Sequence, residues 1–161
     1  MEFQKRLDKA IQRGQRASDA RARAEAEQAL SEKELQRLHG QHRLEFSEHV
    51  ERCLRQLADR FPGFRFETIV DNRGWGAAIS RDDLLLKPPR EPSTAFSRLE
   101  MVIRPLSAYA VLELSAKATI QNKEVFNRTH YQRLAEIDPT SFTEMIDNWS
   151  LEFAELYAAK N

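Results

Sequence analysis

Residues 46–79, FSEHVERCLRQLADRFPGFRFETIVDNRGWGAAI, change the spacing of their apolar side chains at Pro62-Gly63. Before this dipeptide the apolar residues follow the period of a helix and form one broad face: Phe46, Val50, Cys53, Leu54, Leu57, Ala58 and Phe61. After it the period is two, and Phe64, Phe66 and Val70 alternate with Arg65, Glu67 and Ile69. Proline and glycine together are a typical stop for a helix. The stretch therefore predicts an amphipathic helix over about 42–61 that leads into a β-sheet.

Further strands are expected toward the C-terminus. Turn residues at 71–74 precede a returning strand at 75–79, and apolar and polar residues alternate over 99–104 and 111–120. Residues 124–130 are a candidate last strand. Between these segments we expect Arg81-Asp82-Asp83 to interrupt the pattern and Leu84-Leu85-Leu86 to form a short buried strand. Residues 87–97 hold three prolines and are expected to be an irregular loop.

The chain closes with a second amphipathic helix over about 139–158. Asp138 with Pro139, or Ser141 with Glu144, supplies its N-terminal cap. Short connections favour an antiparallel meander of about five strands, and the two amphipathic helices are available to cover one face of it. The fold class we predict is α+β, with a long N-terminal helix before the sheet.

That long helix is predicted from residues 2–38, which lack proline and are rich in Ala, Glu, Gln, Arg and Lys. Gly40 indicates either a bend in one continuous helix or a helical hairpin at His39-Gly40-Gln41. We divide the chain into a charged helix at 1–41 and a compact α+β domain at 42–161. A heptad seam through the helix is apolar only at its ends, where it holds Phe3, Leu7, Leu35 and Leu38.

An isolated helix of this kind is only marginally stable. We therefore expect residues 1–41 to bind a protein partner, or a second copy of the chain, through those four seam residues. The chain has no glycine-rich phosphate loop and no GxSxG, CxxC or zinc-finger spacing. The predicted function is consequently a non-enzymatic interaction or adaptor module that forms a homo-oligomer or binds another protein.

The alternative is a small-ligand-binding protein or enzyme that uses the polar, open face of the sheet. Arg104, Glu113 and Lys117 are the candidate ligand-binding residues on that face, and Trp75 is a candidate stacking platform beside two glycines. Cross-strand ion pairs and core packing are the competing interpretations of these four residues.

The charge balance and the cysteine content reduce the number of functional classes that fit the sequence. The chain has 25 basic and 25 acidic residues, so we do not expect nucleic-acid binding, although Lys5, Arg6, Lys9, Arg13 and Arg16 cluster near the N-terminus. One cysteine, Cys53, excludes an intrachain disulfide and fits a cytoplasmic protein, and we expect it to be a small buried hydrophobe. No segment is apolar enough to span a membrane.

Metal and cofactor sites are not predicted from the sequence. His42, Glu45 and His49 share a helix face, but their spacing differs from the HExxH pattern of zinc proteins. Solvated polar residues explain this face more simply, so the sequence predicts no metal, no cofactor and no catalytic residue.

Overall fold

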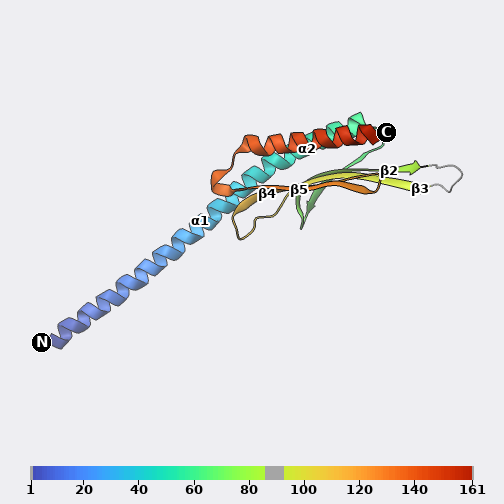
Figure 1. Ribbon diagram of the computed structural model, residues 1–161. Coiled ribbons are helices and arrows are strands. Elements are labelled where there is room, and N and C mark those ends of the chain that lie inside the picture. Colours follow the sequence, from blue (N-terminus) through green and yellow to red (C-terminus); the bar gives the residue numbers. More distant parts are fainter. Residues whose placement is uncertain (1, 86–92, 161) are drawn as a thin grey trace. The chain divides into compact units, whose positions relative to one another are not determined.

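The computed structural model describes residues 2–85 and 93–160, apart from the side chains of residues 27–30, 85 and 93. The elements follow the predicted α+β order (Figure 1). They are α1 (Glu2–Arg60), β1 (Arg65–Asp71), β2 (Gly74–Leu85), β3 (Ser93–Ile103), β4 (Val111–Ile120), β5 (Lys123–Arg133), the short 3₁₀ helix η1 (Leu134–Glu136) and α2 (Pro139–Lys160). The chain divides into two compact units, one ending at Arg37 and the other beginning at Leu38.

The first unit is the N-terminal part of α1. Its described side chains are exposed from Glu2 onward, except for that of Leu35, which is half-buried. The helix continues without a break through Gly40 to Arg60. One continuous helix is therefore confirmed, and the alternative of a hairpin at residues 39–41 is wrong.

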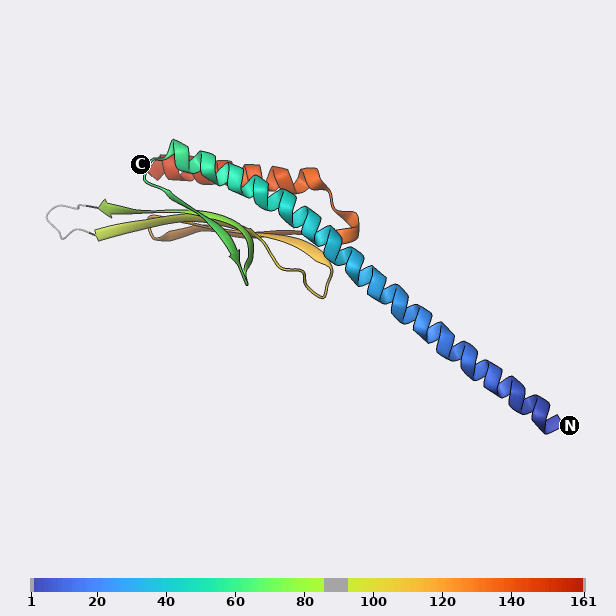
Figure 2. The same cartoon turned by 180° about the vertical axis from the view of Figure 1, so that it is seen from behind.

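The second unit is a two-layer sandwich. Its sheet has the strand order β1-β2-β3-β4-β5, and each neighbouring pair is antiparallel, which confirms the meander. The α1 segment after Leu38 and α2 lie on the same face of this sheet (Figure 2). Aromatic rings join the two helices, since those of Phe46 and Phe142 stack with centroids 4.9 Å apart. The core between the layers includes these fully buried side chains: Phe46, Leu54, Ile79, Leu99, Leu114, Phe153 and Tyr157.

The first hairpin departs from the predicted pattern at its tip. Ile69 is 4% exposed, whereas Val70 is 68% exposed, the reverse of the apolar set that the alternation suggested. Ile69 pairs with Gly76, and it forms a small cluster with Ala78 and Val102 on the sheet face opposite the helices. The predicted open face is thus polar at its margins and apolar at this point.

The region around residues 81–97 also differs from the prediction. β2 does not stop at Arg81-Asp82-Asp83 but pairs with β3 as far as Leu85, and β3 already begins at Ser93. Leu84 is 65% exposed, so the expected buried strand is wrong at that residue; Leu86 and the proline-rich segment 87–92 lie outside the described residues. The polar residues are tolerated because this end of the hairpin is open to solvent and because Arg81 forms an ion pair with Asp83 at 2.6 Å.

Candidate functional site

Three side chains with metal-ligating or catalytic chemistry meet where α1 and α2 run side by side. His49 and Cys53 lie four residues apart on α1, so they share one helix face, and Asp147 faces them from α2. The His49 Nε2 atom lies 2.7 Å from Asp147 Oδ1 and 3.7 Å from Cys53 Sγ. The Cys53 thiol donates a hydrogen bond to Asp147 Oδ1 over 3.4 Å. All three donor atoms lie within 4.8 Å of one another.

This arrangement does not make Cys53 a nucleophile. In a catalytic triad, one ring nitrogen of the histidine faces the nucleophile and the other faces the carboxylate. Here the same nitrogen, Nε2, is the one near both the sulfur and Asp147, while Nδ1 accepts a hydrogen bond from Arg52 over 3.3 Å. Burial, and then the adjacent Asp147 carboxylate, raise the pKa of the Cys53 thiol to about 11. In the metal-free chain the thiol is therefore mainly protonated at neutral pH, which makes it a poor nucleophile.

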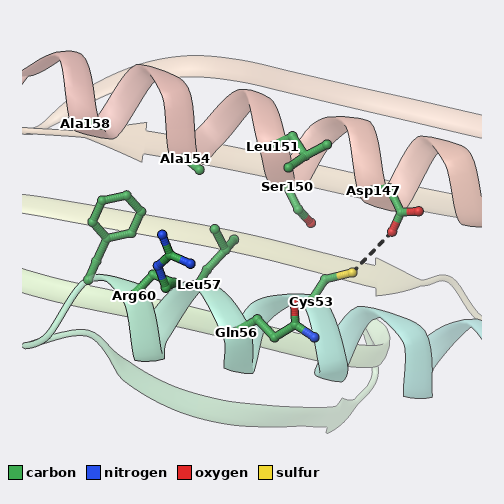
Figure 3. A pocket seen from close by; sticks show the side chains of 10 residues that line it. Cys53, Gln56, Leu57, Arg60, Asp147, Ser150, Leu151, Ala154 and Ala158 are labelled. Atoms are coloured by element: carbon green, nitrogen blue, oxygen red, sulfur yellow. Dashed lines mark hydrogen bonds between the residues drawn. The ribbon is translucent and has the colours of Figure 1, made fainter.

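Cys53 and Asp147 of this cluster lie at one end of a groove between the two helices (Figure 3). The groove has a volume of about 650 Å³. It is lined by Cys53, Gln56, Leu57, Arg60, Phe61, Asp147, Ser150, Leu151, Ala154 and Ala158. The polar groups of this lining belong to Cys53, Gln56, Arg60, Asp147 and Ser150, and the other walls are apolar. Leu151 is 66% exposed there.

The sequence signal for this cluster was incomplete. His49 and Cys53 show the i, i+4 spacing in the sequence itself, although we predicted Cys53 to be a buried hydrophobe and it is only half-buried. Asp147 lies 98 residues from His49, and no local pattern connects them. The predicted face of His42, Glu45 and His49 does not converge, because the His42 ring stacks on Phe46 and Glu45 is exposed.

The candidate ligand-binding residues of the sheet are placed in three different surroundings. Arg104 lies 3.6 Å from Glu113 in an ion pair, and its Nη1 donates a hydrogen bond to the Arg73 carbonyl over 3.0 Å. Lys117 lines a separate cleft of about 220 Å³ on the open face. Trp75 pairs with Ile103, a core residue of the helix-covered face, and therefore lies on the other side of the sheet from Lys117.

Trp75 is engaged by α1. The guanidinium carbon of Arg43 lies 4.4 Å from the centre of its ring, and the His39 ring meets it edge-on at 6.2 Å. His39 is itself buried and its Nε2 donates a hydrogen bond to the Arg104 carbonyl over 3.1 Å. The packing explains why Trp75 does not present a stacking platform on the open face.

The cleft beside Lys117 is electrostatically balanced. Its arginines, Arg73 and Arg98, both bind Glu100, at 2.8 and 3.0 Å. Arg73 also pairs with Asp71 and Arg98 with Glu67. A cleft of this volume is smaller than the roughly 300–1,000 Å³ typical of small-molecule sites.

The seam residues predicted to bind a partner differ in exposure. Phe3 is 75% exposed and Leu7 46% exposed, while Leu35 and Leu38 are half-buried. Ile11, which follows Leu7 by one helical turn, is 51% exposed and extends the same apolar stripe.

Comparison with protein-family models, with curated proteins and with solved structures found no match to this chain. Among the described residues, no helix combines the length and the apolar character needed to cross a lipid bilayer.

Proposed function

We propose that the protein is a non-enzymatic interaction module that self-associates by antiparallel pairing of the N-terminal part of α1. The observation that carries this proposal is the exposed apolar stripe of Phe3, Leu7 and Ile11 on a helix whose described side chains up to Arg37 are exposed, except that of Leu35. Helices in water gain most of their stability from packing an apolar face. Such a stripe on a long helix is therefore expected to be covered.

Charge along the helix favours a second copy in the opposite direction. Residues 2–23 contain seven basic and three acidic side chains, an excess of four positive charges. Residues 24–37 contain four acidic and two basic side chains, an excess of two negative charges. Antiparallel pairing sets the basic half of each copy against the acidic half of the other, whereas parallel pairing sets like charges together.

The apolar ends of the seam support the same orientation. In an antiparallel pair, Phe3 and Leu7 of one copy meet the region of Leu35 and Leu38 of the other. The middle of the seam holds small residues, Ala10, Gly14, Ala17 and Ala24, together with the polar Arg21 and Gln28. Large apolar contacts at both ends would then flank a centre of small and polar residues.

The test is the assembly state of the full chain by sedimentation equilibrium. A dimer is expected, and Leu7→Asp should weaken it by about tenfold or more, because the new carboxylate would be buried in the seam. Gln12→Asp is the matched control: it adds the same charge five residues away, on the exposed side of the helix that faces away from the seam, and should leave the dimer intact. A chain that is monomeric at all concentrations would contradict self-association.

The relative orientation of the two helices in the dimer is tested by the distance between two spin labels, one on each copy. A label at Gln4→Cys, in a Cys53→Ser background, should lie about 50 Å from its counterpart in an antiparallel dimer, given a rise of about 1.5 Å per residue. A parallel pair would bring the two labels to about 10 Å, the interaxial distance of packed helices. That short distance would exclude the antiparallel arrangement while leaving self-association in place.

A further inference from the structure

We propose that His49, Cys53 and Asp147 form a zinc site with three protein ligands and one water-filled position. The proposal is independent of the self-association above, since all three residues belong to the unit that begins at Leu38. Imidazole nitrogen, thiolate sulfur and carboxylate oxygen are the ligand types that zinc takes from proteins. No other group of three or more His, Cys, Asp or Glu side chains among the described residues brings its donor atoms together in this way.

The donor atoms already have nearly the spacing of a tetrahedral site. With Zn–S near 2.3 Å and Zn–N or Zn–O near 2.1 Å, two ligands at a tetrahedral angle lie about 3.4–3.6 Å apart. Cys53 Sγ lies 3.7 Å from His49 Nε2 and 3.4 Å from Asp147 Oδ1. The third separation, 2.7 Å between His49 Nε2 and Asp147 Oδ1, is a hydrogen bond that must open by less than about 1 Å to admit the ion.

The backbone supports this geometry. His49 and Cys53 are held four residues apart on a regular helix, so their relative positions are fixed by the helix itself. The flanking residues Val50 and Leu54 are fully buried in the core, which fixes the rotation of α1 about its axis. On α2, Ile146 is fully buried beside Asp147 and fixes the other wall.

The Asp147 side chain supplies the adjustable ligand. It is 50% exposed, whereas that of His49 is 21% exposed. A small movement of an exposed carboxylate costs little, so the site can open without a change in core packing. Solvent access at this point also leaves room for the fourth ligand, which we assign to water at the end of the groove that Cys53 and Asp147 line.

One neighbouring side chain, that of Arg52, disfavours the binding of a zinc ion. The Arg52 guanidinium donates to His49 Nδ1 over 3.3 Å, and zinc binding at Nε2 requires that Nδ1 carry the proton instead. Arg52 is exposed and can turn away into solvent. Its positive charge and its hydrogen bond nevertheless weaken the site, so its removal should tighten zinc binding.

The experiment is titration of the purified full chain, stripped of metal, with Co²⁺ and with Zn²⁺. Bound cobalt should show a thiolate-to-metal charge-transfer band in the near ultraviolet and the visible bands of a tetrahedral ion, and Zn²⁺ should displace it. Cys53→Ser should abolish the charge-transfer band. Asp147→Asn and His49→Gln should each weaken zinc binding by about 100-fold or more, because even outer-sphere partners contribute 10- to 100-fold.

Two variants sharpen the test. Arg52→Gln should tighten zinc binding by about fivefold, the factor expected when a unit positive charge roughly 8 Å from a divalent ion in water is removed. Glu48→Gln removes an exposed carboxylate next to His49 that is not a ligand, and it should leave the affinity unchanged. A saturating excess of Zn²⁺ should raise the melting temperature of the wild-type chain by about 5–10 °C and that of Cys53→Ser by much less.

A cobalt complex without a thiolate band would overturn the assignment. Equal zinc affinities of the wild-type chain and of Cys53→Ser would also overturn it. The same holds if Glu48→Gln weakens zinc binding and Asp147→Asn does not. Asp147 is half-exposed and His49 partly so, and neither variant should prevent folding; circular dichroism of each metal-free variant verifies this.

Discussion

A Cβ atom on Gly76 would lie 1.9 Å from the carbonyl oxygen of Met101. Gly76 is paired with Val102 in the sheet, and no side chain can be placed there without moving the β3 backbone. A Cβ atom on Gly74, which has a φ of 141°, would likewise lie 2.1 Å from the Ile103 carbonyl oxygen. These contacts bring the β2 and β3 backbones together where Ile69, Ala78 and Val102 are buried on the open face.

Gly76→Ala is therefore expected to lower the free energy of unfolding by about 3 kcal/mol, because the added methyl group collides with backbone rather than with a movable side chain. The measurement is the urea midpoint at constant m-value. Gly40→Ala is the matched control. A Cβ on Gly40 meets nothing within 4 Å, and alanine in a helix interior should raise stability by about 0.5–1 kcal/mol. Equal midpoints for Gly76→Ala and the wild-type chain would contradict the close packing.

Asp83 and Asp82 are neighbours in β2, and we expect them to contribute differently to the free energy of unfolding. Asp83 accepts hydrogen bonds from Arg81 at 2.6 Å and from the hydroxyl of the buried Tyr157 at 3.1 Å. Among the described residues, Asp82 has one ion pair, a long contact of 3.9 Å with the exposed Arg65. Asp83→Ala should cost about 2 kcal/mol, since it removes an acceptor that links β2 to α2.

Asp82→Ala should change stability by less than about 0.5 kcal/mol, as is usual for exposed ion pairs. Both variants are measured by thermal and urea unfolding of the full chain. A larger loss for Asp82→Ala than for Asp83→Ala would show that the link between the sheet and α2 has been misassigned.

Two histidines are expected to reduce stability in mild acid. Burial lowers the pKa of His39, although its hydrogen bond to the Arg104 carbonyl acts in the opposite direction, and burial also lowers the pKa of His130. A group with a lowered pKa binds protons less readily in the folded than in the unfolded state. Its contribution is complete above the unfolded value of about 6.5 and is lost as the pH falls below it.

The free energy of unfolding should accordingly decrease between about pH 7 and pH 5.5. His39→Gln keeps a donor for the Arg104 carbonyl and should remove part of this decrease, and the double variant with His130→Gln should remove more. The comparison is made by urea unfolding across that pH window. A pH dependence that is unchanged in the double variant would show that other groups are responsible.

Salt should weaken the proposed dimer. The pairing of the basic half of one helix with the acidic half of another is a surface interaction, and the screening length falls from about 10 Å at 0.1 M salt to about 3 Å at 1 M. The dissociation constant from sedimentation should therefore rise by about threefold to tenfold over that range. A dimer that tightens with salt would indicate that apolar contacts, rather than charge, select the partner.

Several features of the fold could be predicted because they depend on the spacing of apolar residues within one segment of the chain. The change of period at Pro62-Gly63, the strand at 111–120 and the amphipathic closing helix all agree with α1, β4 and α2. Each of these segments carries its own pattern, so no knowledge of distant residues was needed.

The predictions of the fold were wrong where pairing with a neighbouring strand outweighed the local preference of the residues. Residues 81–83 are polar and were expected to break the sheet, yet they pair with residues 95–97 of β3. Ile69, and not Val70, is buried at the tip of the first hairpin, because Ile69 lies opposite Gly76 and packs with Ala78 and Val102 on the face opposite the helices. Neither of these pairings can be read from the periodicity of one strand.

The amino-acid sequence by itself determined the α+β class, the two amphipathic helices and the fact that His49 and Cys53 share a helix face, because helical and strand periods relate only residues close along the chain. The tertiary structure alone decided that Trp75 is packed under α1 and that Asp147 completes a three-residue cluster with His49 and Cys53. Those relationships depend on how two helices pack on a curved sheet, and packing brings together residues about a hundred positions apart that share no local signal.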